Sequence, residues 1–461
     1  MKSLVDGGGA LAAGLTDIRR QFKLPERFPA EVEQAAAQAA TRQPTGHRDL
    51  TAWPFVTLDP AASTDLDQAF HIERSGRDVL LHYAIADVAW FVDDDGPIDR
   101  ESWRRGATQY LPDGKTRLYP ASLSEGAASL LPDGPRPAVV FHVRVDEHGA
   151  ARLDSATRAV IRSRAKLAYD SVTASQLPED FVELWQRIGR GEEDRGAARV
   201  DPAEQEVVRT PAGGYELTFR PRLASEDQNA AMSLATNLAV AASLFGARTG
   251  LFRVMDPPDQ RAVARLRHTA RALGVSWAEG RDLAEFERGL SPADPKQAAM
   301  MLAIRRSGGH ARYEAFTPAH APWHEAVAAA YAHATAPLRR LADRYVVMAA
   351  LAVATNEPVP PTSADAFSRL PPVMGDADAL GSQIDRAVVD LAEAVMMADR
   401  IGSSFAAVVT DVDERGARIQ LSDLPVVGRV PAHRVQPGDP LTVVVTAADA
   451  RTRTVSFTRA G

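Results

Sequence analysis

"DVLLHYAIADVAWFV" (residues 78–92) is a run of apolar and β-branched residues with polar ones interspersed, and the turn-forming residues 93–97 (DDDGP) end it. A run of this composition with such a boundary predicts a β-strand. A second run, "PAVVFHVRVDEHG" (137–149), predicts another strand that a Gly turn stops. The Pro- and Gly-rich stretch between them, residues 104–123, is expected to be a long ordered loop.

Helical patterns dominate from about residue 163 onward, apart from a predicted strand at 215–221. Residues 226–250 begin with acidic side chains and end in Arg and Gly, which suits the helix dipole and a glycine cap. Residues 325–355 predict two helical stretches interrupted near Ala336-Pro337. Residues 51–400 therefore combine predicted strands and helices in a mixed α/β region of a chain of the α+β class.

The two ends of the chain differ from this middle part. Residues 403–461 read as about five short strands joined by turns, which is typical of a small OB barrel. Seven Arg against six acidic residues make this region slightly positive. Residues 1–50 are predicted to be a short helical segment, with one helix from Pro29 through Ala40, and their length also suits a helix-turn-helix module.

Composition excludes several classes of protein. The 461 residues, 45% hydrophobic and 25% charged, suit a globular chain of two or three domains. The absence of cysteine excludes disulfides, thiolate zinc sites and cysteine nucleophiles. No apolar run approaches the roughly 20 residues of a membrane span, and no signal-peptide pattern opens the chain. We therefore expect a cytoplasmic protein with no membrane partner, and nothing in the sequence suggests more than a monomer.

"TLDPAASTDLDQAF" (57–70) gathers three carboxylates, Asp59, Asp65 and Asp67, on what reads as a loop leaving a strand. Like charges at this spacing repel and raise one another's pKa, so a cation is expected among them. Carboxylates flanked by Ser and Thr are hard oxygen ligands that suit Mg²⁺. One or two such ions can activate water against a phosphodiester. A solvated acidic turn is the alternative interpretation.

Three further sites have chemistry to offer. Arg339 and Arg340 follow a proline at a predicted helix start, where they could clamp a phosphate or simply lie on the surface. Tyr110 lies in the Pro- and Gly-rich loop, where its ring can stack on a base or pack into the core. His320 and His324 are four apart, but a proline between them disfavours the helix that zinc-binding HExxH sites use. The net charge of −7 does not favour a nucleic-acid binder. Net charge, however, does not report the local charge of an internal substrate path.

Together these stretches resemble the ribonuclease II/R (RNB) family of 3′-to-5′ exoribonucleases. "DLTAWPFVTLDPAASTDLDQA" (49–69) looks like the family's catalytic stretch, and the resemblance covers roughly residues 25–461. Eight motifs in the family's order are far more specific than any one of them. After the catalytic stretch come "HYAIADVAWFV", "RRGATQYLP", "LSEGAASLLPDG", "IRSRAKLAYDSV", "RGAARVDP", "GLFRVMDPPD" and "YAHATAPLRRLAD", and then an S1-type OB barrel.

The resemblance implies Mg²⁺-dependent, processive hydrolysis of single-stranded RNA from its free 3′ end, with the strand threaded into a channel and 5′-mononucleotides released. It implies that Asp59, Asp65 and Asp67 are metal-site aspartates, with Asp67 the most critical. Arg339 matches the arginine that steadies the scissile phosphate. Tyr110 matches the aromatic residue that stacks on the terminal nucleotides. The cation expected at the carboxylate loop would then be Mg²⁺, with Arg339 assisting.

Several positions depart from the family pattern. Gln68 occupies the place of a fourth metal-site aspartate, and an amide is a weaker, neutral ligand. Asp385, which we expect to contact substrate, stands in place of a glutamate and is one methylene shorter. A second stacking aromatic falls at Val200, and Phe252 is the candidate substitute. Family members also commonly carry two cold-shock domains before the catalytic domain, and residues 1–50 are too short to hold even one.

Two other functions compete with the exoribonuclease. One is a non-catalytic RNA-binding relative, which the departures at Gln68 and Asp385 motivate. The other is a metal-dependent hydrolase of small phosphate esters, which explains the aspartates but not the OB barrel. The sequence leaves open the physiological RNAs, one versus two metal ions, the length of the end product and the fate of structured RNA.

Overall fold

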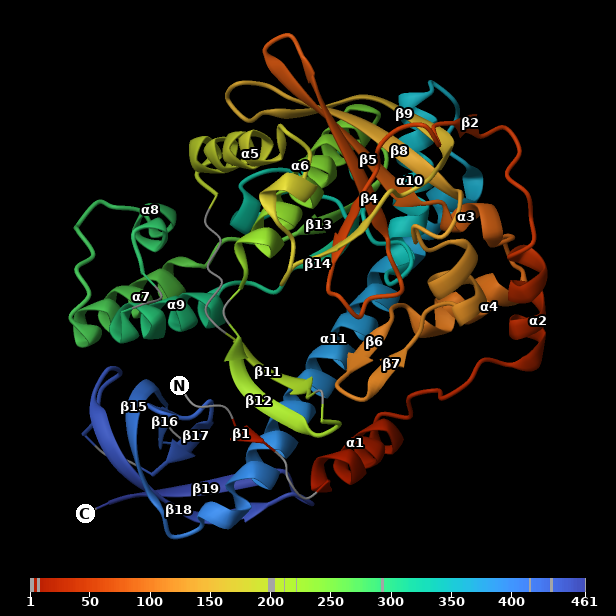
Figure 1. Ribbon diagram of the computed structural model, residues 1–461. Coiled ribbons are helices and arrows are strands. Elements are labelled where there is room, and N and C mark those ends of the chain that lie inside the picture. Colours follow the sequence, from red (N-terminus) through yellow and green to blue (C-terminus); the bar gives the residue numbers. More distant parts are fainter. Residues whose placement is uncertain are drawn as a thin grey trace.

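The computed structural model describes residues 4–5, 9–197, 204–210, 212–220, 222–291, 294–413, 416–431 and 434–460. A large mixed α/β body lies above a small all-β body (Figure 1). The long helix α11 (Pro361–Met397) runs from the first to the second. The predicted α+β class with a C-terminal all-β domain is confirmed. No helix of the described part is long and apolar enough to cross a membrane.

The large body is built on a five-stranded sheet in the order β2-β9-β8-β5-β4. The runs at 78–92 and 137–149 supply its central strands β5 and β8. β5 ends at Ala86, however, and Val88–Phe91 form the helical turn α3, so the strand prediction is wrong at its end. Val88 and Phe91 are buried in this turn as they would be in a strand, so apolar character alone does not distinguish the two. The strands are β2 (Arg48–Asp49), β4 (Gln68–Ser75), β5 (Asp78–Ala86), β8 (Arg136–Val145) and β9 (Ala151–Ile161).

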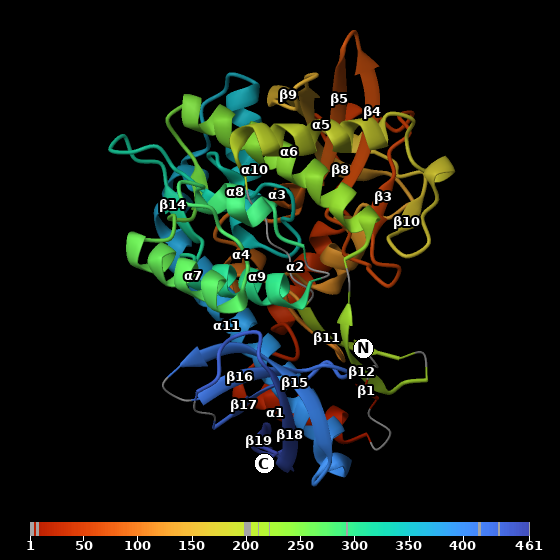
Figure 2. The same ribbon diagram turned by 90° about the vertical axis from the view of Figure 1, so that its left-hand side faces the viewer.

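Helices cover this sheet. α6 (Ala224–Gly246) packs against β9, β8 and β5. It confirms the helix predicted at 226–250 except at its end, where Ala247 and not a glycine is the C-cap. α10 (Leu341–Ala354) packs on α6 and β9, while α5 (Phe181–Arg195) packs on α6 and β8. Figure 2 shows α5 and α6 beside each other near the sheet. The apolar faces of these helices and of the sheet form the main hydrophobic core.

The stretch before α10 is not the helix that its alanine content predicts. Only Glu325–Val327 form a single 3₁₀ turn there, and α10 begins at Leu341. Side chains outside this stretch accept hydrogen bonds from its backbone N–H groups. The N–H of Ala334 donates to Asn237, and the N–H of Ala336 donates to Asp343. Because these N–H groups bond to side chains, a regular helical ladder is not needed to satisfy them. The irregular segment is what places Arg339 and Arg340.

The N-terminal segment is helical, as expected, but it holds a second helix besides the one predicted at 29–40, and the two do not form a helix-turn-helix pair. α1 (Ala10–Gln21) packs on α11, and α2 (Ala30–Ala39) packs on α4 (Pro97–Arg105). Their buried side chains belong to two different hydrophobic clusters. Gly14 allows the close approach of α1, because a Cβ there would lie 2.5 Å from the side chain of Leu391. The helix-turn-helix hypothesis is therefore wrong for this segment.

The C-terminal body contains the five strands that the sequence predicts. They pair in the order β17-β16-β15-β18-β19. Its core joins that of α1 and α11, so the barrel is docked on the long helix. The strands are β15 (Ser404–Asp413), β16 (Gly416–Leu421), β17 (Val427–Val430), β18 (Pro440–Asp449) and β19 (Thr454–Arg459).

Short elements complete the fold. β3 (Thr57–Asp59) pairs in parallel with β10 (Lys166–Ala168), and β6 (Gln109–Leu111) forms a hairpin with β7 (Gly114–Thr116). The helices α7, α8 and α9 share a small core of their own and lie just above the barrel in both views (Figures 1 and 2). The remaining elements are β1 (Leu4–Val5), η1 (Leu123–Ala127), η2 (Ala174–Gln176), β11 (Glu204–Arg209), β12 (Tyr215–Arg220), β13 (Leu251–Val254), α7 (Gln260–Leu273), α8 (Leu283–Arg288), α9 (Pro295–Ser307), β14 (Arg312–Ala315) and η4 (Ala398–Arg400).

Candidate active site

A cavity of about 1920 Å³ opens beside the carboxylate loop. Small-molecule pockets typically measure about 300–1,000 Å³, so this one is large enough for several units of a polymer. The loop, the β6–β7 hairpin, α6, the β11 strand and α11 all contribute to its wall. Of the predicted site residues, the cavity is lined by Asp59, Asp65, Asp67, Gln68, Tyr110, Arg339, Arg340 and Asp385.

The carboxylate loop is fixed at both ends and in its middle. Asp59 is the last residue of β3, and Asp67 directly precedes β4 of the central sheet. In the middle, the Lys166 Nζ donates to the carbonyls of Ala61 (2.7 Å) and Ser63 (2.5 Å). The expectation of a loop leaving a strand is confirmed, and these anchors hold its carboxylates in place.

Asp67 is the most deeply buried carboxylate of the loop. Its Oδ1 accepts a hydrogen bond from the backbone N–H of Leu338 (2.7 Å), and its Oδ2 lies 3.6 Å from Arg339 Nε. Burial raises the pKa of Asp67 to about 8, although the Arg339 guanidinium opposes the shift. Burial likewise raises the pKa of Asp59 to about 7, again against Arg339. Both carboxylates are thus short of positive charge, which is the condition for cation binding.

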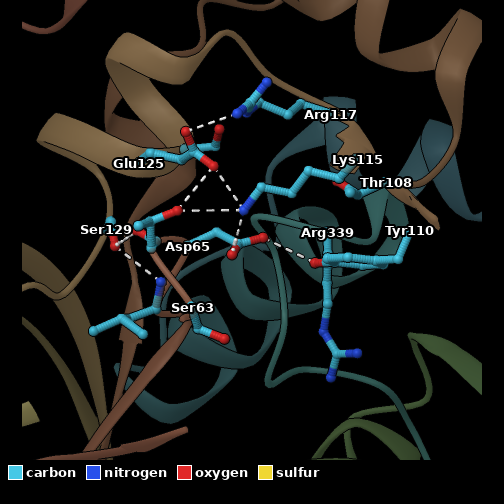
Figure 3. Close-up of polar contacts among 12 residues, drawn as sticks. Ser63, Asp65, Thr108, Tyr110, Lys115, Arg117, Glu125, Ser129 and Arg339 are labelled. Atoms are coloured by element: carbon cyan, nitrogen blue, oxygen red, sulfur yellow. Dashed lines mark hydrogen bonds and ion pairs between the residues drawn. The ribbon is translucent and has the colours of Figure 1, made fainter. Parts of the chain in front are cut away.

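Asp65 has a different environment, although it lies in the same loop. Lys115 Nζ lies 2.6 Å from its Oδ1, and the Tyr110 hydroxyl donates to its Oδ2 at 2.8 Å (Figure 3). Lys115 also contacts Glu125 at 2.6 Å. The charge of Asp65 is therefore already compensated by a residue of the protein.

Gln68 faces neutral groups. Its Oε1 accepts hydrogen bonds from the hydroxyls of Tyr83 and Ser233, the latter at 3.1 Å. Two neutral hydroxyl groups thereby fix the amide oxygen at the cavity wall. It remains available to a metal ion only as a neutral ligand.

Arg339 and Arg340 are placed by a backbone strap. The Thr108 N–H donates to the Arg339 carbonyl (3.0 Å), which ties this segment to the chain leading into the β6–β7 hairpin. The Arg339 side chain is 46% exposed and lines the cavity. Arg340 instead makes two 2.8 Å hydrogen bonds to the buried carboxylate of Asp343. Arg339 is the arginine available to a phosphate, whereas Arg340 is engaged inside the fold.

The aromatic residues only partly meet the sequence predictions. Tyr110 is 48% exposed and lines the cavity, so its ring is accessible for stacking. Phe252 is fully buried in β13, and a ring without exposed surface cannot stack on a base, so that prediction is wrong. Val200 lies outside the described residues. Tyr169 and Tyr331 also line the cavity, and sequence reasoning missed both as candidate stacking residues.

The donors at the loop fit Mg²⁺ in a restricted way. No group of three or more His, Cys, Asp or Glu side chains in the described ranges is arranged to hold a metal ion. Mg²⁺, however, is usually bound by one or two carboxylates, with waters and substrate phosphates completing its shell. Asp59 and Asp67, both desolvated, supply such a pair. The residues present therefore fit Mg²⁺ better as two carboxylate ligands than as four.

Several supporting residues were missed at the level of sequence. Asp343 and Asn237 hold the segment of Arg339, and Lys115 and Glu125 hold Asp65. Only Asp343 had a sequence signal, its i, i+3 spacing from Arg340 at a predicted helix start. The others come from distant parts of the chain, and no local pattern connects them to the site.

The sequence of the chain matches the RNB domain over residues 47–356 and the RNase II-type exonuclease C-terminal S1 domain over residues 403–460. The first match covers more than half of the 461 residues, so the chain belongs to the RNB-domain family. Among its relatives, Ribonuclease R of Escherichia coli (strain K12) is 27% identical over 454 residues, covering 89% of this chain and 55% of the relative. The chain thus spans about half the length of this curated relative.

Solved structures share the fold. A Mycoplasma genitalium RNase R in complex with ribose-methylated single-stranded RNA superposes with a TM-score of 0.87 at 19% identity, covering 98% of this chain and 78% of that one. Yeast Ssd1, described as a pseudonuclease, superposes with a TM-score of 0.70 at 15% identity, covering 97% of this chain and 58% of that one. At identities below 20% this likeness shows a shared fold, and a fold alone does not define the chemistry of a site.

Proposed function

We propose that this chain is a 3′-to-5′ exoribonuclease that hydrolyses single-stranded RNA with Mg²⁺ and releases 5′-mononucleotides. The observation that carries the proposal is the convergence of Asp59, Asp67 and Arg339 at one cavity of about 1920 Å³, in a chain of the RNB-domain family. Ribonuclease R relatives and a neighbour in complex with single-stranded RNA support the substrate class. A cytoplasmic location and a monomeric state remain predictions from the sequence.

Each residue has a separable task in this proposal. Asp59 and Asp67 would hold the ion, and the Leu338 N–H keeps the Asp67 carboxylate oriented. Mg²⁺ bound there supplies a charge that lowers the pKa of a bound water and offsets the charge of the phosphate. Arg339 donates to the scissile phosphate as negative charge develops on it. Tyr110 stacks on a terminal base and so sets which phosphodiester lies beside the carboxylates.

Threading and processivity extend the same proposal. The cavity wall runs from the carboxylate loop past α6 to the β11 strand and to Asp385 on α11. A strand held by several contacts along such a path can advance after each cleavage without leaving. The S1-type barrel, docked on α11, adds a further surface for single-stranded nucleic acid.

A second candidate is a protein that binds RNA without cleaving it. Gln68 favours this reading, because an amide takes the place where the family carries a carboxylate, and Lys115 already neutralises Asp65. Its weakness is that Asp59, Asp67 and Arg339 are all present at the cavity. A hydrolase of small phosphate esters is less favoured, because the cavity exceeds what one small ester would fill.

A time course on 5′-labelled single-stranded RNA tests the proposal. Wild type with Mg²⁺ is expected to yield a limit fragment of a few nucleotides without a ladder, together with free 5′-mononucleotides. The variant Asp67→Asn, and wild type with a chelator, are expected to leave the RNA intact. RNA that wild type binds but never shortens would overturn the exonuclease and support the binding protein. A ladder of intermediates would reject processivity alone.

A further inference from the structure

Tyr110 and Lys115 form a cross-strand pair on the β6–β7 hairpin. They are directly opposite each other in the register of the two strands. Side chains of directly opposed residues lie on the same face of a strand pair and within reach of each other. Both reach the same carboxylate: the Tyr110 hydroxyl donates to Asp65 Oδ2 at 2.8 Å, and Lys115 Nζ donates to Asp65 Oδ1 at 2.6 Å. Each oxygen of Asp65 thus has its own donor from one hairpin.

Lys115 is itself held in place from the other side. Its Nζ lies 2.6 Å from Glu125 Oε1 in η1. Glu125 accepts further hydrogen bonds from Arg117 and Thr64, both at 2.9 Å. Figure 3 shows Lys115 between Asp65 and Glu125, with the Arg339 guanidinium pointing away from this cluster. The ammonium group is largely shielded, since only 15% of the Lys115 side chain is exposed.

This arrangement holds the carboxylate of Asp65 from two sides. The Lys115 ammonium lies 2.6 Å from one carboxylate oxygen, and the other oxygen accepts the Tyr110 hydroxyl at 2.8 Å. Charge-assisted hydrogen bonds of this kind orient their donors more tightly than neutral ones. The Tyr110 ring is thereby tied to the loop that carries the cavity carboxylates.

We propose that Lys115 is a positioning residue, which holds Asp65 as the acceptor for the Tyr110 hydroxyl and so fixes the ring that faces the cavity. Asp65 then serves the stacking platform rather than the metal ion. The inference rests on the proposed function, because the ligand stacked on Tyr110 is taken to be the end of an RNA strand. It deepens that function by assigning the grip on the last nucleotides to a lysine, an aspartate and a tyrosine acting as a unit.

A double-mutant cycle tests this unit. We would measure the affinity of a five-nucleotide single-stranded RNA, with a chelator present to prevent hydrolysis, for wild type, Lys115→Met, Tyr110→Phe and the double variant. Tyr110→Phe keeps the ring but removes the hydroxyl that Asp65 accepts. Each single change is expected to weaken binding about five- to tenfold, within the range of one stacking contact. The double variant is expected to bind no more weakly than either single one, because both changes break the same connection.

A matched control separates the unit from a general charge effect. Arg117→Met removes a cation that contacts Glu125 but not Asp65, and it is expected to weaken binding far less than Lys115→Met does. Lys115→Arg keeps the charge and is expected to restore part of the affinity. If Lys115→Met does not fold, Lys115→Gln, which can still donate but carries no charge, takes its place in the same cycle.

The possible outcomes decide between the two proposals. Losses from Lys115→Met and Tyr110→Phe that simply add would overturn the positioning role, as would an equal loss from Arg117→Met. So would wild type that does not bind the short RNA. Coupled losses in a wild type that binds but never shortens RNA would support the positioning role while rejecting the exonuclease. With an active wild type, a longer limit fragment from Lys115→Met is the expected companion result.

Discussion

Arg339 and Arg340 are neighbours in sequence with opposite environments. The Arg339 side chain is 46% exposed at the cavity, while Arg340 is bound to Asp343, whose side chain has no exposed surface. Arg339 can be lost with less cost to folding, because water reaches its guanidinium and the buried Asp67 beside it, whose pKa is raised to about 8, can remain protonated. Removing one partner of a buried pair leaves an uncompensated charge in the interior. Replacing Arg339 should therefore affect the rate of hydrolysis, whereas replacing Arg340 should affect the stability of the fold.

We predict that Arg339→Met slows single-turnover RNA hydrolysis by about 10²–10³-fold, by the loss of a donor to the phosphate, and leaves the melting temperature near that of wild type. We predict that Arg340→Met lowers the free energy of unfolding by about 3–5 kcal/mol. Thermal melts and single-turnover kinetics on both variants check this, and each variant is the control for the other. Equal effects of the two changes on stability would contradict the division of roles.

At the scale of elements, the β6–β7 hairpin is held at its turn by the N-terminal helix α1. Arg19 forms a forked contact with Asp113, at 2.7 and 3.1 Å, and also donates to the Gly114 carbonyl at 3.3 Å. The same hairpin carries Tyr110 and Lys115 toward the cavity. A helix whose apolar side packs on α11 thus also restrains an element of the candidate active site.

We predict that Arg19→Gln speeds amide hydrogen exchange across residues 110–116 while changing the global stability by about 1 kcal/mol or less. A partly exposed ion pair contributes little to overall stability, but local opening of the hairpin depends on it directly. The matched control is Arg20→Gln, because Arg20 pairs with exposed Asp17 on its own helix. If Arg20→Gln speeds exchange in the hairpin as much as Arg19→Gln does, the contact between Arg19 and Asp113 is not what restrains the hairpin.

At the scale of the whole molecule, Glu393 on α11 connects the large α/β body to the barrel. Its Oε1 accepts hydrogen bonds from Gln205 (2.6 Å) in β11 and from the N–H of Val427 (2.8 Å) in β17. Burial raises the pKa of Glu393 to about 7, although these two hydrogen bonds oppose the shift. The folded protein therefore keeps a proton on Glu393 that the unfolded chain releases near its ordinary pKa of 4.5.

This shift predicts a pH dependence of stability with a definite sign. Between pH 4.5 and about 7 the folded state binds more protons than the unfolded state, so stability falls as pH rises and stays lower above pH 7. Glu393→Gln cannot ionise and keeps an oxygen for both hydrogen bonds. We expect it to match wild type near pH 4 and to exceed it at pH 8, by up to about 3 kcal/mol.

Denaturant unfolding of wild type and Glu393→Gln at pH 4, 6 and 8 measures this difference. The other titrating groups are the same in both proteins, so their contributions cancel in the comparison. A constant offset between the two proteins across this pH range would contradict the raised pKa of Glu393. A variant less stable than wild type at pH 8 would contradict the sign of the effect.

The sequence by itself determined the fold class, the carboxylate loop and the barrel. Alternating and apolar runs specify strands such as β5 and β8 because side chains on a pleated strand repeat with a fixed period. The spacing of Asp59, Asp65 and Asp67 marked the loop because short-range order of charges is a local property. The family motifs added the pairing with Arg339, which lies far away in the chain.

Only the tertiary structure decided what each of these groups does. In the folded chain Asp65 contacts Lys115 and Tyr110, and Arg340 forms an ion pair. Phe252 is buried, and the stretch before α10 does not form a helix. Each of these outcomes depends on partners that are distant in sequence. Burial and Coulomb interactions act through space, whereas propensity and periodicity act along the chain. Sequence therefore indicated which residues could form the site, and packing determined which of them remain exposed at the cavity.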